Sequence, residues 1–418
     1  MGGAGRATGG MRFRLTILES LLQRVRREFR AEPTMVAEHA AGLRRDGDEF
    51  ELFVPSRLGT EPAALARGGL VRLGQISPGL RGVEFHYWNA FDLPRLDWPR
   101  LDLAFYGEPG CSAAWIQDGR AYPLDDIRIV GPRMEVWRPA CPPPALHGEI
   151  PEDGPYSRYI GAIGGAAVHE RLRALRVTLV ASSRLGSLLA TQLARAGVRD
   201  LTLIDPDRLD AHSLDAVDTF ADALGQPKVE AVAQYLARCA PATQLRCIVG
   251  DVASEPGLAA AAASDVIVSA PDDDRGRFVA SLIATAYHRV LLDVGTGVRR
   301  ERAQNQAGAD LRLVLPGQGC LLCVGGLAFR RQDVDWRRNR AGSLRSLNSL
   351  ATGQAMLLFE RLVMGDLDRT TWLRVEVDVR GVAAVHEPEW TVDPECPICA
   401  RAGLGDAAFL ADEIPGGR

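Results

Sequence analysis

The second half of the chain alternates short apolar runs with segments whose apolar residues recur every three to four positions. The short runs predict buried strands, and the periodic segments predict helices. We predict strands at Val177–Ala181, Leu201–Ile204, Leu245–Val249, Val266–Ser269, Val290–Val294, Leu311–Leu315 and Arg374–Val379, and helices at Leu185–Ala196, Lys228–Arg238, Phe278–Tyr287 and Leu347–Leu362, with an alanine-rich helix before Val266. This alternation is typical of an α/β, doubly wound, mostly parallel sheet that binds ligands at the carboxyl ends of its strands.

The first part of the chain has a different pattern. An amphipathic helix is predicted at Leu15–Phe29, followed by strands at Glu49–Val54, Val83–Tyr87, Ala113–Ile116 and Ile127–Val130. Residues 11–140 therefore predict a smaller α+β domain. The proline-rich stretch at 141–155 predicts a linker because proline interrupts helices and central strands. Residues 156–410 then form the second domain. Residues 1–10 are expected to be a disordered tail, with Met11 as the initiator, and residues 411–418 a C-terminal tail.

Composition narrows the class of protein. The 418 residues are 46% hydrophobic and 24% charged, which is typical of a soluble globular protein. A formal net charge of -4 argues against a nucleic acid or an anionic membrane as partner. No apolar run approaches the roughly 20 residues that cross a bilayer. We also find no secretory signal, so a cytoplasmic protein is expected.

The loop after the first strand of the α/β domain is a candidate phosphate site. It reads Ala181-Ser-Ser-Arg-Leu-Gly186, and a helix begins within it. A helix N-terminus offers free N–H groups to a phosphate, Gly186 permits close approach of the backbone, and Ser182 or Ser183 is a candidate helix cap. With a single glycine, this loop is also compatible with an ordinary strand-to-helix turn.

Two acidic residues end the second strand, about 20 residues beyond that loop. Asp205 and Asp207 lie where a nucleotide ribose is usually held. The alternative is that they cap a turn, which aspartate commonly does. The spacing from the loop favours the ribose, most clearly for Asp205.

Basic and acidic residues farther along the chain fit a polyphosphate. Lys228 follows Gly225-Gln-Pro in the first turn of a helix, where a cation is unfavourable unless an anion offsets it. Asp272-Asp-Asp-Arg-Gly-Arg277 follows the strand Val266–Ser269 and can hold Mg²⁺. The alternatives are a solvated lysine and an acidic loop that caps the next helix.

The strongest spacing signal comes from cysteine. Cys320-Leu-Leu-Cys323 and Cys396-Pro-Ile-Cys399 form two Cys-x-x-Cys pairs among the eight cysteines of the chain. Two such turns complete a tetrahedral Zn²⁺ site, and four protein ligands make it structural. The alternative is two unrelated reduced pairs. Cys239 and Cys247 are predicted on a helix and a strand as buried apolar residues, so no thioester cysteine is identified.

Taken in order, these motifs resemble the ThiF/MoeB/HesA family, whose members include relatives of ubiquitin-activating enzymes. The family pattern is a glycine-rich loop, Asp-x-Asp, Gly-x-x-Lys, an Asp loop with an arginine five residues on, and paired Cys-x-x-Cys. Tyr156-Ser-Arg158 resembles the motif that precedes the domain in the family. The residues that match the family's nucleotide site are Ser183, Gly186, Asp205, Asp207, Ser213, Lys228, Asp272 and Arg277.

The resemblance implies a Rossmann-like domain with structural zinc that uses ATP and Mg²⁺ to adenylate a carboxylate and release pyrophosphate. The substrate would be the C-terminal carboxylate of a ubiquitin-like protein, a sulfur carrier or a peptide. Lys228 and Arg158 would offset phosphate charge, Asp272 would hold Mg²⁺ and Asp205 the ribose. A homodimer is expected because the family arginine at the position of Arg158 reaches the partner's ATP.

Departures from the family pattern leave other functions open. Where the family has Ser-Asn-Leu-x-Arg, this chain has Ser213 in place of the asparagine and Ala216 in place of the arginine. Either Arg184, Arg208 or Arg277 replaces that arginine, or the chain is a catalytically weak scaffold that binds a nucleotide or a partner. An NAD- or FAD-dependent oxidoreductase ranks last, because Lys228 is not needed for hydride transfer.

The N-terminal domain resembles, at a few residues, a JAB/MPN isopeptidase domain. The resemblance rests on Glu38-His-Ala-Ala-Gly-Leu43 and on His86-Tyr-Trp88. That family holds a catalytic zinc with a His-x-His pair and an aspartate, and Trp88 replaces the second histidine here. We therefore expect a domain that serves recognition rather than peptide cleavage. The alternative is an unrelated α+β domain.

Overall fold

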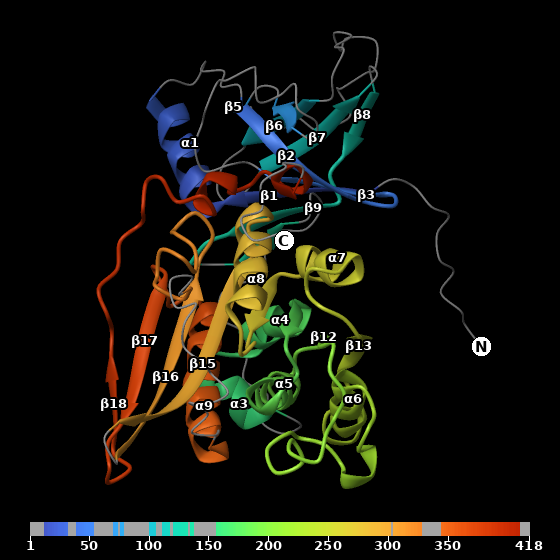
Figure 1. Cartoon of the computed structure of the whole chain (residues 1–418). Helices are drawn as coiled ribbons and strands as arrows, with labels where there is room; N and C mark the ends of the chain where they lie inside the picture. The colour runs from blue at the N-terminus through green and yellow to red at the C-terminus, as the bar shows by residue number, and fades with distance from the viewer. Residues whose placement is uncertain are drawn as a thin grey trace, which may run out of the picture. The chain divides into compact units, whose positions relative to one another are not determined.

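The computed structural model of the chain describes residues 12–31, 39–53, 70–73, 76–78, 100–105, 111–117, 120–132, 134–137, 156–301, 304–327 and 344–409 (Figure 1). The chain forms two compact units. Unit 1 comprises Met1–Pro143, Ala286–His288 and Arg401–Arg418, and unit 2 comprises Pro144–Thr285 and Arg289–Ala400. Among the described residues, no helix combines the length and apolar character needed to cross a membrane.

A six-stranded mixed sheet in unit 1 has the order β10-β9-β1-β3-β2-β4. Its strands are β1 (Arg12–Leu18), β2 (His39–Asp46), β3 (Glu49–Phe53), β4 (Leu70–Leu73), β9 (Asp126–Val130) and β10 (Glu135–Trp137). A second sheet is formed by β5 (Ile76–Pro78), β6 (Arg100–Phe105), β7 (Cys111–Gln117) and β8 (Arg120–Pro123). The predicted strands at Glu49, Ala113 and Ile127 are confirmed.

The predicted helix from Leu15 to Phe29 was wrong at Leu15–Leu18, which belong to a strand. Residues 12–18 form β1, and helix α1 begins only at Glu19 (Glu19–Ala31). The reason is that β1 lies between two parallel neighbours, β3 and β9, and is buried on both faces. Leu15 and Ile17 are buried, and the Thr16 hydroxyl donates to Glu51 Oε1 at 2.6 Å. Pairing with two strands outweighs the local helical periodicity.

Several expectations for the N-terminal region lie outside the described residues. These are the strand at Val83–Tyr87, the JAB/MPN-like residues Glu38 and His86 to Trp88, the linker at 141–155, and the two tails. His39 lies at the start of β2.

The core of unit 2 is an eight-stranded sheet with the order β13-β12-β11-β14-β15-β16-β17-β18. The first five strands in that order are parallel: β11 (Arg176–Val180), β12 (Asp200–Ile204), β13 (Gln244–Ile248), β14 (Val266–Ser269) and β15 (Val290–Glu301). The antiparallel strands are β16 (Gln304–Val314), β17 (Thr371–Val377) and β18 (Ala383–His386). This confirms the predicted α/β class with a mostly parallel sheet.

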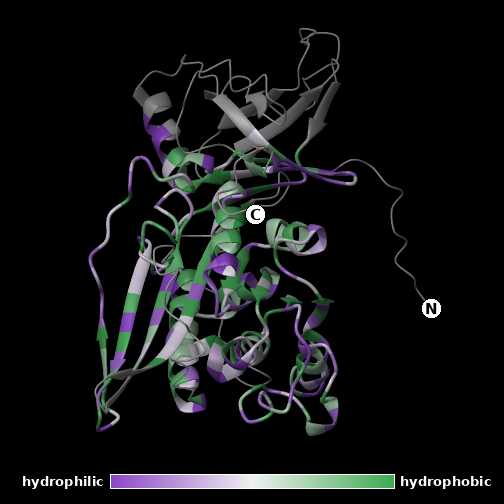
Figure 2. Cartoon of the chain, viewed as in Figure 1, coloured by the Kyte–Doolittle hydropathy of each residue, from purple (hydrophilic) through white to green (hydrophobic). Residues whose placement is uncertain are grey.

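Hydropathy distinguishes the two parts of this sheet. The parallel strands β11, β12 and β14 are apolar and almost wholly buried, as expected when helices cover both faces. In β17, hydrophobic and hydrophilic residues alternate from Leu373 to Val377, and Figure 2 shows the bands. Strand β18, which the sequence did not predict, is exposed along its length.

Seven helices in the described part of unit 2 accompany these strands. They are α3 (Ser157–Ala162), α4 (Ala166–Ala174), α5 (Arg184–Ala196), α6 (Lys228–Cys239), α7 (Glu255–Ala263), α8 (Asp274–Ala286) and α9 (Arg345–Met364). Helix α9 packs against β15, β16 and α5, and buries Ala351, Ala355 and Phe359. The predicted helices are therefore confirmed within a few residues at their ends.

Candidate functional site

The turn between β11 and α5 keeps a tight shape despite its few glycines. Ala181 has a φ of 72°, a left-handed conformation that favours glycine. A Cβ on Gly186 would lie 1.8 Å from the Ala181 carbonyl oxygen, so only glycine fits there. The backbone of the turn thus has the shape of a glycine-rich loop, and the N-terminus of the 13-residue helix α5 opens beside it.

Asp205 joins this turn to the end of β12. Its Oδ2 accepts the backbone N–H of Ser182 at 2.7 Å, and its Oδ1 accepts the N–H of Asp207 at 2.9 Å. The side chain is buried, and burial raises the pKa of Asp205 against the lowering effects of the Asp207 N–H and of Lys228. Asp205 therefore shapes the turn, and each oxygen keeps a second lone pair for a ligand.

Lys228 lies at the same edge, in the first turn of α6. Its Nζ is 2.7 Å from Asp207 Oδ2, and its backbone N–H donates to the Asp207 carbonyl at 2.9 Å. The Lys228 side chain is 12% exposed, whereas that of Asp207 is 65% exposed. An ion pair with so exposed a carboxylate is worth about 0–1 kcal/mol, so a phosphate can displace it.

The composition of the chain also singles out Lys228. The chain holds 49 lysines and arginines together, and Lys228 is the only lysine. An ammonium is a compact charge with rotatable donors, whereas a guanidinium is a rigid planar fork. The chain uses arginine at all the other Lys/Arg positions. A lysine at position 228 therefore indicates that this position requires the compact charge of an ammonium.

The segment after β12 contains the residues that depart from the family pattern. The Ser213 hydroxyl donates to Asp210 Oδ1 at 2.7 Å. Ala216, at the position of the family arginine, is buried. Arg184, the first residue of α5, reaches this segment and lies 3.1 Å from Asp215 Oδ1.

Arg345 is a residue of this site that sequence reasoning missed. It is the first residue of α9, and its Nη1 donates to the Ala216 carbonyl at 2.8 Å. Its Nη2 lies 2.5 Å from Asp218 Oδ1. The signal that marks it is the one that marks Lys228, namely a cation in a first helical turn, where the helix dipole disfavours it.

The Asp272–Arg277 loop follows β14, which is the neighbour of β11 in the sheet. Asp273 Oδ1 accepts the Gly276 N–H at 2.7 Å and so caps the start of α8. Asp272 is exposed and lies at the carboxyl end of β14. The loop therefore combines the capping role of one aspartate with an exposed carboxylate that a magnesium ion can reach.

Arg277, a predicted nucleotide residue, contacts groups of the protein itself. Its Nη1 lies 2.5 Å from Asp293 Oδ2, its Nε donates to the Pro271 carbonyl at 3.2 Å, and its Nη2 donates to Pro271 and Val294 carbonyls. Asp293 is fully buried, which raises its pKa, while Arg277 and Arg312 oppose that rise. All three nitrogens of Arg277 are thus engaged within the protein.

Arg158 lies in α3, in an exposed position. The same helix is anchored to α9, because the Tyr159 hydroxyl donates to Glu360 Oε1 at 3.0 Å. Burial raises the pKa of Tyr159, and the charge of Glu360 raises it further. Tyr159 therefore stays a neutral donor, and Arg158 projects from a fixed helix into solvent.

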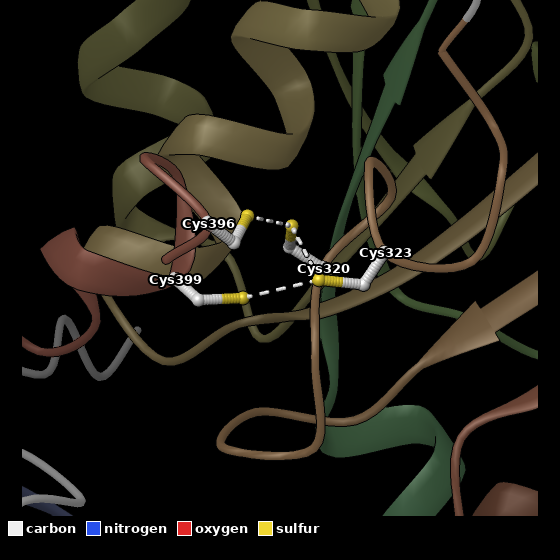
Figure 3. A group of neighbouring side chains, drawn as sticks. All are labelled: Cys320, Cys323, Cys396 and Cys399. Atoms are coloured by element: carbon white, nitrogen blue, oxygen red, sulfur yellow. Dashed lines mark hydrogen bonds between the residues drawn. The ribbon is translucent and has the colours of Figure 1, made fainter. Parts of the chain in front are cut away.

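The four predicted zinc ligands come together (Figure 3). Cys320 Sγ is 3.8 Å from Cys323 Sγ and 3.5 Å from Cys396 Sγ, and Cys323 Sγ is 3.7 Å from Cys399 Sγ. Tetrahedral zinc with Zn–S bonds of about 2.3 Å places sulfurs about 3.8 Å apart. Hydrogen bonds from Cys320 and Cys399 lower the pKa of Cys396, which favours a first thiolate. The residues therefore fit zinc.

The structure thus gathers Ser183, Gly186, Asp205, Asp207 and Lys228 around the carboxyl ends of β11 and β12. The family model described as ThiF family matches residues 156–370, just over half of the chain. The chain belongs to the ThiF family.

Curated relatives of this ThiF family member carry the name ubiquitin-like modifier-activating enzyme 5. The protein from Caenorhabditis briggsae is 22% identical over 229 residues, which are 50% of this chain and 51% of that protein. The protein from Aedes aegypti is 31% identical over 93 residues, 22% of this chain and 23% of that protein. The chain matches about half the length, or less, of these relatives.

Solved structures of MccB from E. coli also align with this ThiF family member. One of them covers 59% of this chain and 75% of that chain, with 17% identity and a TM-score of 0.48.

Proposed function

We propose that this chain uses Mg-ATP to adenylate the C-terminal carboxylate of a ubiquitin-like protein, sulfur carrier or peptide. The observation that carries the proposal is Lys228, the only lysine of the chain, which lies at the carboxyl end of β12 against an exposed and displaceable aspartate. Membership of the ThiF family and relatives named ubiquitin-like modifier-activating enzyme 5 support the substrate class.

In the proposed reaction, a carboxylate oxygen of the substrate attacks the α-phosphorus of ATP. The acyl–phosphate bond forms as the bond between the α- and β-phosphates breaks, and pyrophosphate leaves. The carboxylate is its own nucleophile, so no catalytic base is needed. Lys228 would release Asp207 and neutralise charge on the phosphates as pyrophosphate departs.

The remaining predicted residues receive proposed roles from their positions. The N–H groups at the start of α5, by Ser183 and Gly186, would face phosphate oxygens. Asp205 would hold the ribose with its free lone pairs, and Asp207 would contribute once Lys228 leaves it. The exposed Asp272 would hold Mg²⁺.

The proposal also covers the metal, the oligomeric state and the cell compartment of the protein. Zinc at the four cysteines would be structural, because four thiolates leave no open position. We also propose a homodimer in which Arg158, exposed on its anchored helix, reaches the partner's nucleotide. The reduced cysteines of the described chain fit a reducing compartment such as the cytoplasm.

A second candidate is a catalytically weak scaffold, and one set of contacts favours it. Lys228, Arg184, Arg345 and Arg277 are each paired with an aspartate of the same chain. A site whose cations are already neutralised attracts a polyphosphate less strongly. In this case the zinc-bearing fold would bind a partner protein without activating it.

Exchange of labelled pyrophosphate into ATP separates the two candidates. The full chain is incubated with Mg-ATP, labelled pyrophosphate and a peptide or ubiquitin-like protein that ends in Gly-Gly. The control is the same substrate with a C-terminal amide in place of the free carboxylate. The adenylation proposal predicts exchange that requires the free carboxylate. Absence of ATP binding in calorimetry at millimolar nucleotide would eliminate the enzyme and leave the scaffold.

A further inference from the structure

The position of the missing family arginine is occupied by backbone and by a buried methyl group. Ala216 is 1% exposed, so a side chain at this position faces the core. Its carbonyl oxygen accepts a hydrogen bond from Arg345 Nη1 at 2.8 Å. A guanidinium is therefore present beside residue 216, although it comes from residue 345, at the start of helix α9.

The partners of Arg345 fix it next to α5. Asp218 binds Arg345 Nη2 through Oδ1 and accepts the Thr191 hydroxyl through Oδ2 at 2.7 Å. The backbone N–H of Asp218 donates to Ser187 Oγ at 3.0 Å. Ser187 and Thr191 are the fourth and eighth of the 13 residues of α5, whose N-terminus opens at the β11 turn. The Asp218 carboxylate thus joins the guanidinium to the middle of α5, and the Asp218 backbone N–H joins the same segment to the first turn of that helix.

Arg345 has N–H groups without a protein acceptor among the described residues, whereas every nitrogen of the Arg277 guanidinium donates to the protein. A guanidinium carries five N–H groups. Among the described residues, Arg345 makes one contact from each Nη and none from Nε, and its side chain is 46% exposed. Arg277 has contacts from all three nitrogens and is 14% exposed. Arg345 can therefore bind an anion without leaving Asp218, whereas Arg277 would have to break a buried pair.

We propose that Arg345 binds the triphosphate of ATP in place of the arginine that is absent at position 216. The proposal rests on the proposed function, since it assigns a further binding residue to the same reaction. Arg345 holds the phosphates with its outward N–H groups while Asp218 keeps the guanidinium in place. The helix dipole of α9, which disfavours a lone cation at this end, adds positive potential at the bound anion.

Calorimetric titration of the full chain with Mg-ATP, inorganic pyrophosphate and adenosine tests the proposal. Arg345→Gln should weaken binding of Mg-ATP and pyrophosphate by about tenfold or more, the loss expected for a charge-assisted hydrogen bond. Adenosine should bind as it does to the wild type. Arg345→Lys should recover part of the lost affinity, because it restores the charge but not the fork.

Arg361→Gln is the matched control, since it removes one arginine from the last turn of the same helix. Arg361 is exposed and pairs with Asp366 at 2.7 Å, so its loss should leave the affinity for ATP unchanged. Thermal unfolding of each variant is measured in parallel. If Arg345→Gln does not fold, Arg345→Lys carries the test, and wild-type affinity in that variant overturns the proposal.

The outcomes separate this proposal from the proposed function. Wild-type affinity for Mg-ATP in Arg345→Gln overturns the role of Arg345 while the adenylation proposal stands. The same follows if Arg184→Gln lowers the affinity and Arg345→Gln does not. A wild-type chain that binds no Mg-ATP at millimolar concentration overturns the proposed function, and the role of Arg345 with it.

Discussion

The sequence predicted more of the cysteine centre (Cys320, Cys323, Cys396 and Cys399) than of the candidate phosphate site around Asp205 and Lys228. At the cysteine centre, two pairs more than 70 residues apart along the chain bring four sulfurs within 4.8 Å of one another. At the carboxyl ends of β11 and β12, Asp205, Asp207 and Lys228 also come together, but Lys228, Arg184 and Arg277 are each held by an aspartate. A metal site is defined by its ligands alone, whereas an anion site depends on every neighbouring charge.

The largest expected effect is at the cysteine centre. Cys396→Ser should release the metal and lower the free energy of unfolding by more than about 4 kcal/mol, because a buried tetrahedral ligand is lost. Metal content and urea unfolding measure the two consequences. Cys239→Ser, which changes a half-buried cysteine on α6, is the matched control. Purified wild-type protein without zinc would contradict this assignment.

A slightly smaller effect is expected at Arg277, which would behave as a structural residue. Arg277→Gln leaves the buried Asp293 unpaired and should cost about 3–5 kcal/mol in the free energy of unfolding. The exposed neighbour Arg275→Gln should cost almost nothing. If Arg277→Gln instead preserves stability and weakens ATP binding, Arg277 is a nucleotide residue, as the sequence first predicted.

Lys228 should affect catalysis rather than stability. Lys228→Ala should lower adenylation by about 10²–10³-fold, the effect of removing one donor that stabilises transition-state charge. Lys228→Arg should not restore full activity, because a planar fork replaces a compact charge. Pyrophosphate exchange and thermal unfolding are compared across the three proteins. Full activity in Lys228→Ala would contradict the phosphate role.

These differences show what the sequence can predict in this chain. Short apolar-rich runs predicted the strands of the parallel sheet, of which β11, β12 and β14 are buried almost throughout, whereas β13 is mostly exposed or half-buried. The apolar pattern missed β18, which is exposed, and misread Leu15, whose strand is decided by neighbours from distant segments. It missed Arg345 for the same reason, since α9 brings that residue to Ala216 across 129 positions.

The smallest effect concerns pH and Asp205. Because burial raises the folded-state pKa of Asp205 above its ordinary 3.8, the folded protein binds this proton more tightly than the unfolded chain. The stability that this proton contributes is fully present below pH 3.8 and is lost as the pH rises through the raised pKa. The loss amounts to about 1.36 kcal/mol for each pH unit that separates the folded-state pKa from the unfolded-state pKa.

Asp205→Asn has no such ionisation. The difference in free energy of unfolding between the wild type and Asp205→Asn should therefore become less favourable to the wild type as the pH rises above 3.8. Urea unfolding at a series of pH values measures it. A difference that grows in favour of the wild type with rising pH would show that the pKa of Asp205 is lowered instead.

The central claim is that Lys228 contacts the phosphates of ATP, and its being the only lysine permits a direct measurement. Reductive methylation of the full chain modifies only this side-chain amine and the N-terminal amine, which mass spectrometry resolves on separate peptides. Mg-ATP at about ten times its dissociation constant should slow methylation of Lys228 by about tenfold and leave the N-terminal amine unchanged. Equal rates at Lys228 with and without millimolar Mg-ATP would contradict the claim.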